Sequence, residues 1–355
     1  MKIALVAPLM ESVPPKLYGG TERVVSVLAE GLVARGHKVT LFASGDSRTA
    51  AELVPCCPHG LRLNSGAADY TAYALTQLGD VYRRAAEFDV IHNHVDYFAF
   101  PFARLTTTAT LTTTHGRLDL PEVLRVYELF PEQALVSISR SQRAPLSNAK
   151  WITTVYNGLN LTAFTFRSEP GTYMAFVGRI SPEKRVDRAI EIARDVGMPL
   201  VIAAKVDPTD RGYYEAAIEP MIRSSPNVEY VGEIDDAQKN ALLGSAYASL
   251  FPVDWPEPFG LVMIESMACG TPVIALPRGS TREVIASGKT GFICDSYEEM
   301  VRAVRRLDEI DRQTCRRYVE TKFSAHAMAV GYEQIYRRLV SGAAGGTRKS
   351  YGKAA

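Results

Sequence analysis

The sequence predicts an α/β fold in which helices cover parallel sheets. Short apolar segments that suit buried strands alternate with segments whose apolar residues recur at helical spacing, and this order favours a doubly wound, parallel sheet. A length of 355 residues is enough for two such domains of about 150 residues each. The hydrophobic content of 46% and the charged content of 22% are those of an ordinary globular enzyme.

Composition excludes several classes of partner. With 40 basic and 39 acidic residues, the chain has no charge excess that would attract nucleic acid. The start, MKIALVAPLM, has only a short apolar core before Glu11 and is typical of a buried strand rather than of a signal peptide. No apolar run reaches the roughly 18 residues of a membrane span, so at most a peripheral membrane contact is expected. The five scattered cysteines match no disulfide or zinc spacing, which favours the cytoplasm.

In the first half, the alternation predicts a helix over 24–34 and strands over 3–7, 39–43, 89–92, 109–114 and 134–138. Ligands of such sheets bind beyond the carboxyl ends of the strands. The loop after the first strand carries Gly19 and Gly20 before Thr21, which we expect to cap the helix. This pair is not a G-x-G-x-x-G motif, so a dinucleotide cofactor is not expected.

Histidines lie at two of these strand ends. His92 and His94 form an H-x-H pair, but no third ligand sits at a suitable spacing, so we expect packing rather than zinc binding. His115 ends the next strand. From the residues alone it can be a structural histidine or a wall of a ligand site.

In the second half, strands are predicted over 173–177, 200–204, 228–231, 248–253 and 271–276. Ser181 is expected to cap a helix that has Pro182 at its first position and Lys184 in its first turn. Arg179 and Lys184 then flank a helix N-terminus, which cations avoid because of the helix dipole. An anion bound between them would explain their presence.

The stretch from Phe251 to Cys269, FPVDWPEPFGLVMIESMAC, predicts a buried strand, a proline-stiffened loop and a helix that starts near Phe259. The free amides of Phe259, Gly260 and Leu261 would suit a phosphate. Glu257 and Glu265 can then face one cleft, whereas a pair of surface acids is the alternative. Asn157–Gly158, between the halves, predicts a turn with positive φ.

EPFGLVMIESMACGTPVIA closely resembles the signature of retaining glycosyltransferases of the family-4 type, and G-R-x-x-x-x-K from Gly178 resembles the diphosphate clamp of that family. The resemblance spans about residues 1–340 and implies the GT-B architecture: two Rossmann-like domains whose parallel sheets face a central cleft. It implies an acceptor-side domain over 1–158, a nucleotide-sugar domain over 159–324 and a helix over 325–340, capped by Ser324, that crosses back to the first domain. The small and polar residues 341–355 are predicted to be disordered.

The resemblance also implies roles for individual residues. The catalytic group comprises Glu257 near the anomeric carbon, Arg179 and Lys184 on the diphosphate, and His115 on the donor sugar. The donor-binding group comprises Gly19 and Gly20 near the diphosphate or the acceptor, Glu265 on the ribose hydroxyls, Phe259, Gly260 and Leu261 on the phosphate, and Ile234 beside the base.

The implied reaction moves a sugar, with retention, from a nucleotide-diphosphate sugar to an acceptor hydroxyl. UDP-sugars are favoured over GDP-sugars. No metal or other cofactor is expected, because two cations and a helix N-terminus can stabilise the leaving phosphate and no D-x-D motif stands out. The acceptor, which can be a glycan, a lipid or lipid-linked molecule, or a small molecule, is expected to contact loops 9–20, 44–70 and 115–130.

Two alternatives remain open. A non-catalytic sugar-nucleotide binding protein would be expected to have lost Lys184 or Glu257, and both are present. Another GT-B enzyme, such as a phosphorylase or an epimerase, is the second alternative. A phosphorylase would need a pyridoxal-phosphate lysine or a phosphate-donor site, for which we find no sequence signal.

Overall fold

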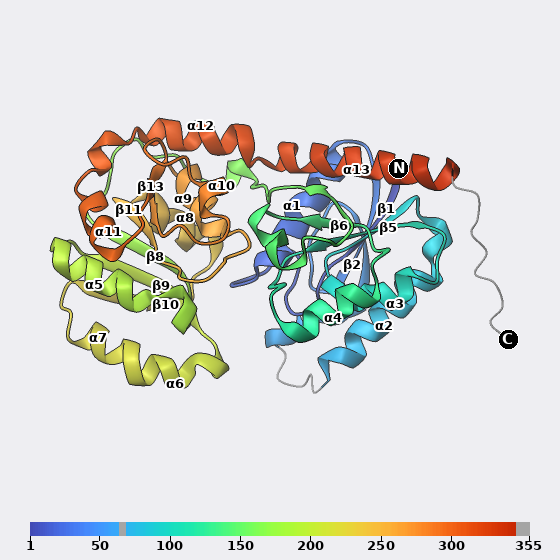
Figure 1. Ribbon diagram of the computed structural model, residues 1–355, viewed down its shortest axis with the longest axis horizontal. Coiled ribbons are helices and arrows are strands. Elements are labelled where there is room, and N and C mark those ends of the chain that lie inside the picture. Colours follow the sequence, from blue (N-terminus) through green and yellow to red (C-terminus); the bar gives the residue numbers. More distant parts are fainter. Residues whose placement is uncertain (64–68, 346–355) are drawn as a thin grey trace.

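The computed structural model describes residues 1–63 and 69–345, and it consists of two lobes that lie side by side (Figure 1). Each lobe contains one parallel sheet covered by helices. The α/β class predicted from the alternation of strands and helices is therefore confirmed.

The first sheet has the spatial order β3-β2-β1-β4-β5-β6-β7, and all of its pairs are parallel. Its strands are β1 Lys2–Val6, β2 Lys38–Ser44, β3 Glu52–Cys57, β4 Val90–Asn93, β5 Ala109–Thr114, β6 Leu135–Ser137 and β7 Trp151–Thr154. Strands β3 and β7 were not predicted from the sequence. Both are edge strands whose residues are mostly half-buried or exposed, so they lack the continuous apolar run of a central strand.

The helices of this lobe are α1 Gly20–Ala34, α2 Tyr70–Arg83, α3 Phe100–Ala103 and α4 Pro121–Leu129. The predicted cap of α1 is wrong. Gly19 is the N-cap, Thr21 lies inside the helix, and no side chain caps it. Gly19 packs so closely on Pro15 that an added Cβ would lie 2.7 Å from the proline Cβ.

The second sheet has the order β10-β9-β8-β11-β12-β13 and is also parallel. Its strands are β8 Met174–Ile180, β9 Leu200–Val206, β10 Val228–Gly232, β11 Ala248–Phe251, β12 Val273–Ala275 and β13 Gly291–Ile293. In both sheets the strand order reverses beside the first strand, between β1 and β4 and between β8 and β11. Such a reversal opens a crevice at the carboxyl ends of the strands, which is where ligands bind in this kind of fold.

The second lobe has these helices: α5 Val186–Val196, α6 Arg211–Tyr213, α7 Glu219–Arg223, α8 Asp236–Gly244, α9 Leu261–Ala268, α10 Thr281–Val284, α11 Tyr297–Val304 and α12 Arg312–Lys322. Met263, Ile264 and Met267 of α9 are fully buried in the core of this lobe. The helix is therefore held rigidly, and so is the N-terminus that it presents to the crevice.

The predicted turn at Asn157–Gly158 is wrong in its conformation, because neither residue has positive φ. Gly158 instead permits a close approach of two chain segments. A Cβ on Gly158 would lie 2.5 Å from the Ser324 carbonyl oxygen. Next to it, the Leu159 amide donates to Phe323 O at 2.8 Å. The two connections between the lobes therefore touch at this point.

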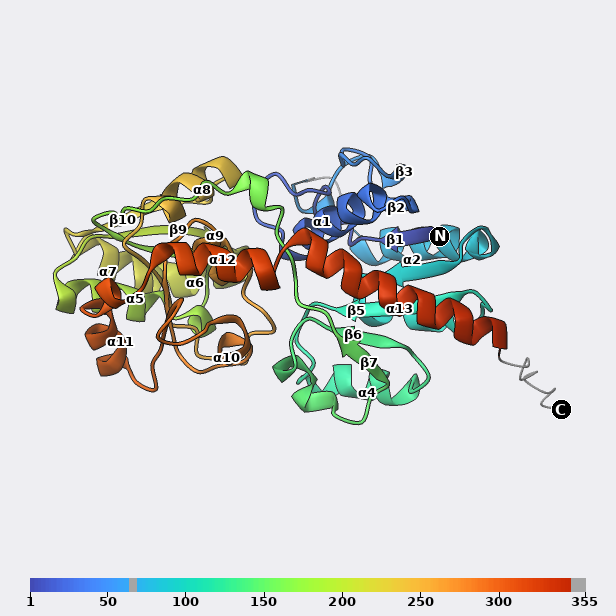
Figure 2. The same ribbon diagram turned by 90° about the horizontal axis from the view of Figure 1, so that it is seen from above.

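The last helix, α13 Ala325–Gly345, lies along the first lobe (Figures 1 and 2). Ser324 Oγ accepts a hydrogen bond from Ala327 N at 3.2 Å, so the predicted cap is confirmed. Tyr332 and Tyr336 are fully buried and join α13 to the core of β1, β4 and α1. The helix also continues to Gly345, which contradicts the prediction of disorder over 341–345, whereas residues 346–355 lie outside the described residues.

Within the described residues, no helix combines the length and the apolar composition that crossing a bilayer requires.

Candidate active site

A cavity of about 470 Å³ lies between the lobes, at the carboxyl ends of the strands. All of the predicted site residues line it. The first lobe supplies Gly19, Gly20 and His115, and the second supplies Arg179, Lys184, Ile234, Glu257, Phe259, Gly260, Leu261 and Glu265. Residues up to 246 positions apart in the chain, such as Gly19 and Glu265, therefore share one site.

Two helix N-termini form part of the cavity wall. Gly260, with φ of 74°, is the N-cap of α9, which starts at Leu261, two residues after the predicted start near Phe259. An added Cβ on Gly260 would lie 2.8 Å from both Phe251 and Met263, so only glycine fits. The second helix is α1 of the first lobe, which begins at Gly20. A Cβ added to Gly20 would lie 3.8 Å from Leu261 Cδ1, so α1 and α9 begin next to each other. Their unpaired amides and dipoles together favour an anion at this place.

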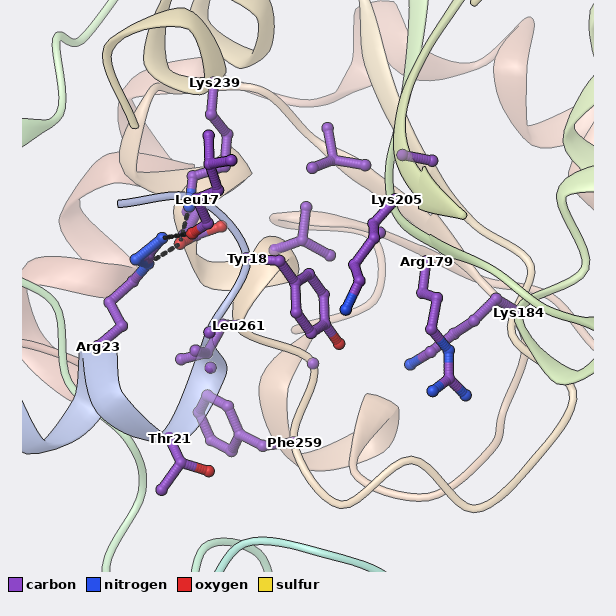
Figure 3. Close-up of a pocket in the computed structure, with 18 of the residues that line it drawn as sticks. Leu17, Tyr18, Thr21, Arg23, Arg179, Lys184, Lys205, Lys239, Phe259 and Leu261 are labelled. Atoms are coloured by element: carbon purple, nitrogen blue, oxygen red, sulfur yellow. Dashed lines mark hydrogen bonds and ion pairs between the residues drawn. The ribbon is translucent and has the colours of Figure 1, made fainter. Parts of the chain in front are cut away.

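Arg179 and Lys184 lie on the opposite side of the cavity (Figure 3). Arg179 donates from Nη2 to Glu183 Oε1 at 2.7 Å, and its Nε lies 3.4 Å from Asp210 Oδ2. Lys184 Nζ is in direct contact with Glu257 Oε2. Both cations are thus held in place by carboxylates.

The predicted placement of Lys184 in the first turn of a helix is wrong. Pro182–Lys184 is a single 3₁₀ turn, and α5 begins only at Val186. Between them Arg185 has a left-handed conformation, with φ of 56°, which interrupts the helical path. Ser181 makes no capping hydrogen bond. Lys184 therefore projects from a tight turn and does not oppose the dipole of α5.

Glu265 is 3% exposed and is the deepest of the predicted acids. Lys239 Nζ lies 2.6 Å from its Oε1, and Arg23 Nε lies 3.8 Å from the same atom (Figure 3). Arg23 belongs to α1 in the first lobe and also pairs with Asp236 Oδ1 at 2.9 Å. This carboxylate is therefore oriented by cations from both lobes.

His115 is half-buried and lies next to two buried histidines, His92 and His94. Its Nε2 lies 2.9 Å from His94 Nδ1. His92 bonds to Tyr336 through Nδ1 at 2.7 Å and to Thr113 through Nε2 at 2.7 Å, so the interpretation of His92 as a packing residue is confirmed. Burial lowers the pKa of His115 to about 3, so its ring is neutral at pH 7. Among the described residues, no group of three or more His, Cys, Asp or Glu side chains is placed to hold a metal ion.

Several charged and polar residues that line the cavity were not named individually from the sequence as site residues, among them Tyr18, Glu22, Arg23, Lys205 and Lys239. Lys205 carried a usable signal, because it lies near the carboxyl end of β9 in register with Arg179. Its Nζ pairs with Asp207 at 2.9 Å and lies 5.3 Å from the centre of the Tyr18 ring. For Arg23 and Lys239 we find no comparable signal, because each lies on a helix and gains its partner only from tertiary contacts.

Two facing Rossmann-like lobes with such a cleft define a GT-B fold, and solved structures confirm it. Sucrose-phosphate synthase from Thermosynechococcus elongatus matches with a TM-score of 0.78 and 21% identity, covering 96% of this chain and 99% of that chain. Anabaena HepE, solved in complex with UDP, matches with a TM-score of 0.74 and 17% identity, covering 96% and 100%.

The family follows from the sequence comparisons. The model for glycosyl transferases group 1 matches residues 163–323, and the model for glycosyltransferase family 4 matches residues 18–162. The glycogen synthase of Mycobacterium tuberculosis is 26% identical over 335 residues, which cover 79% of this chain and 80% of that protein. This chain therefore belongs to the family-4, group 1 glycosyltransferases and is a glycosyltransferase.

Proposed function

We propose that this glycosyltransferase transfers a sugar from a UDP-sugar to an acceptor hydroxyl, with retention of configuration and without a metal ion. The observation that carries the proposal is the convergence of Arg179, Lys184 and the N-terminus of α9 on the cavity that also holds Glu257. These groups are the ones that departure of a nucleoside diphosphate requires.

When the bond to the sugar breaks, negative charge grows on the β-phosphate. Donors and cations that are already oriented toward that charge lower the barrier without further reorganisation. Arg179 and Lys184 supply the positive charge, and the amides at Gly260 and Leu261 supply hydrogen-bond donors. We propose that the phosphates displace the contacts of these cations with Glu183 and Glu257, so that Glu257 is released toward the sugar hydroxyls near the anomeric carbon.

We propose roles for the other predicted residues from their places on the cavity wall. A carboxylate can accept both ribose hydroxyls at once, and Glu265 is held by Lys239 in a fixed orientation for this purpose. Ile234, just beyond β10, is proposed to contact the base, and Gly19 and Gly20 to lie against the diphosphate. His115, neutral and linked to His94, is proposed to bond to the donor sugar.

A uridine nucleotide is proposed as the donor, supported by the UDP complex of the similar Anabaena structure. The acceptor is proposed to lie against loops 9–20, 44–70 and 115–130 of the first lobe. Of these, residues 64–68 are outside the described residues.

All five cysteines of the chain are free thiols, which supports a proposed location in the reducing cytoplasm.

The proposal is tested by thermal unfolding with UDP, GDP, ADP and their sugar conjugates, each measured with EDTA and with Mg²⁺. A ligand present at 100 times its Kd stabilises by about 2.7 kcal/mol, which shifts the melting curve of a chain of this size by roughly 2–4 °C. We expect UDP and a UDP-sugar to shift the curve in EDTA. A shift only with Mg²⁺ would contradict metal independence, and a shift only with GDP or ADP would contradict the choice of base.

Retention is tested separately from binding. The anomeric configuration of the transferred sugar is read by NMR from the product of a donor with known configuration. We expect the configuration of the donor to persist, and an inverted product would contradict the proposed mechanism.

A further inference from the structure

Glu22 is a buried carboxyl group of the cavity wall that has no partner within the described residues. It lies in the first turn of α1 and is 5% exposed. No ion pair and no hydrogen bond from another residue to its side chain is found in the described part of the chain. Burial raises the pKa of this carboxyl to about 7, against the opposing effects of its own backbone amide and of Arg23.

The other carboxyl groups of the cavity do have partners. Each has a cation within ion-pair distance: Glu11 and Glu233 have Arg62, Asp236 has Arg23, Glu257 has Lys184, and Glu265 has Lys239. Burying a carboxylate without a partner costs free energy, so such a group persists where a ligand supplies the missing hydrogen bonds. Glu22 differs from its neighbours in this respect.

A purely local role for Glu22 does not account for this arrangement. At the third position of a helix, a glutamate can accept a hydrogen bond from the amide of the N-cap residue. Here the N-cap is Gly19, and the described residues contain no bond between Gly19 N and the Glu22 side chain. The carboxyl oxygens are thus available to the cavity.

The surroundings of Glu22 indicate which kind of chemical group can bind to its carboxylate. It follows Gly20, which packs against Leu261 at the N-terminus of α9, where the diphosphate is proposed to bind. A second anion is excluded beside a carboxylate, whereas hydroxyl groups can donate to both of its oxygens. Of the two hydroxyl-bearing groups attached to a donor diphosphate, the ribose is proposed to bind Glu265, which leaves the transferred sugar as the partner of Glu22.

We propose that the Glu22 carboxylate binds hydroxyl groups of the transferred sugar of the donor and thereby contributes to the choice of sugar. This inference rests on the proposed function, because it requires a nucleotide-sugar in the cavity. It makes Glu22, together with His115, a contact of the first lobe that distinguishes a nucleotide-sugar from the free nucleotide.

The test compares Glu22→Gln and Glu22→Ala with the wild type and with Glu128→Gln, a control at an exposed position of α4. The probes are UDP with UDP-glucose, GDP with GDP-mannose, and ADP with ADP-glucose. Calorimetric titration at pH 8 first identifies the pair that binds to the wild type, and the variants are then titrated with that pair.

We expect both Glu22 variants to bind the nucleoside diphosphate within about twofold of the wild type and the nucleotide-sugar at least tenfold more weakly, the scale for losing a hydrogen bond to a charged group. Unchanged affinity for the nucleotide-sugar would overturn the inference. An equal loss for both ligands would also overturn it, because Glu22 would then act on the nucleotide or on the fold. If no pair binds to the wild type, the proposed function itself fails.

Discussion

At the scale of single residues, the site consists of charges that are already oriented before a ligand arrives. Lys184 contacts Glu257, and Lys239 holds Glu265 at 2.6 Å. A donor diphosphate would replace a carboxylate as the partner of each phosphate-binding cation. Because the cations stay in place while the partner changes, little reorganisation is needed when charge develops in the transition state.

Replacement of Lys184 by alanine tests this view. We expect kcat/KM to fall by on the order of 10²-fold or more, the scale for losing one preorganised group that stabilises the transition state. Steady-state kinetics with the donor found by thermal shift measures the effect, and Lys289→Ala, at an exposed position outside the cavity, is the matched control. If the Lys184→Ala variant had wild-type activity, the proposed catalytic role of Lys184 would be wrong.

The raised pKa of Glu22 predicts a particular dependence of stability on pH. The folded chain keeps this proton up to about pH 7, whereas the unfolded chain releases it near the ordinary value of 4.5. The stabilisation from the bound proton is therefore complete below about pH 4.5 and is lost as the pH rises through about 7.

Glutamine at position 22 does not titrate. We therefore expect the free energy of unfolding of Glu22→Gln, minus that of the wild type, to rise by about 2–3 kcal/mol between pH 4.5 and pH 8. Urea unfolding at several pH values measures this difference. A difference that stays constant across the range would show that Glu22 has an ordinary pKa in the folded protein.

At the scale of elements, α9 determines the geometry of the proposed phosphate site. Its apolar residues are buried in the second lobe, and Gly260 allows the chain to enter the helix from a left-handed conformation. The functional amides therefore have a fixed position relative to the sheet. The same applies to α1, whose apolar residues Val24, Val25 and Leu28 are buried under the first sheet.

Gly260→Ala should damage both stability and binding. An alanine Cβ would lie 2.8 Å from Phe251 and Met263, and positive φ costs an L-residue about 1–2 kcal/mol in addition. We expect a loss of at least about 2 kcal/mol in unfolding free energy and a weaker affinity for the nucleoside diphosphate, measured by denaturant unfolding and calorimetry.

The control for this variant is Gly79→Ala in α2. Nothing lies within 4 Å of the added Cβ there, and the backbone is helical. This substitution should be neutral or stabilising by about 0.5–1 kcal/mol. If both glycine variants behaved alike, the special conformation of Gly260 would have no role.

At the scale of the whole molecule, polar contacts cross between the lobes. Tyr18 N donates to Glu233 Oε1 at 2.9 Å, and Arg62 reaches the same atom at 3.2 Å. On another side, Glu283 accepts from the amides of Arg140 and Ser141 at 2.8 Å each. The cavity depends on both lobes, so the relative position of the lobes controls the site.

Glu233→Gln tests the role of these contacts. It removes the charge that pairs with Arg62, so we expect a larger radius of gyration without donor and a several-fold weaker affinity for the donor. Small-angle scattering and calorimetry measure the two effects. Glu229→Gln, at an exposed position of β10, is the control. Identical scattering of the Glu233 variant and the wild type would exclude this contact as a determinant of the lobe arrangement.

The sequence alone determined the fold class, the strands at the centre of both sheets and a set of residues that line the cavity between the lobes. Periodic apolar residues, a glycine at a helix start and a charge at a strand end are local features. They act within a few positions of the chain, and they can therefore be read from it. The approach of Glu257 and Glu265 to one cavity followed from such local geometry.

Only the tertiary structure decided the environment of these residues. Arg23 approaches Glu265, which lies in the other lobe, and Lys239 reaches the same carboxylate from a different helix. The lack of a partner for Glu22 among residues 1–63 and 69–345 likewise depends on what packs nearby, and so do the interrupted helix after Lys184 and the edge strands β3 and β7. Burial and ion pairing are properties of neighbours in space, and residues that are distant in the chain become neighbours only when the two lobes are assembled.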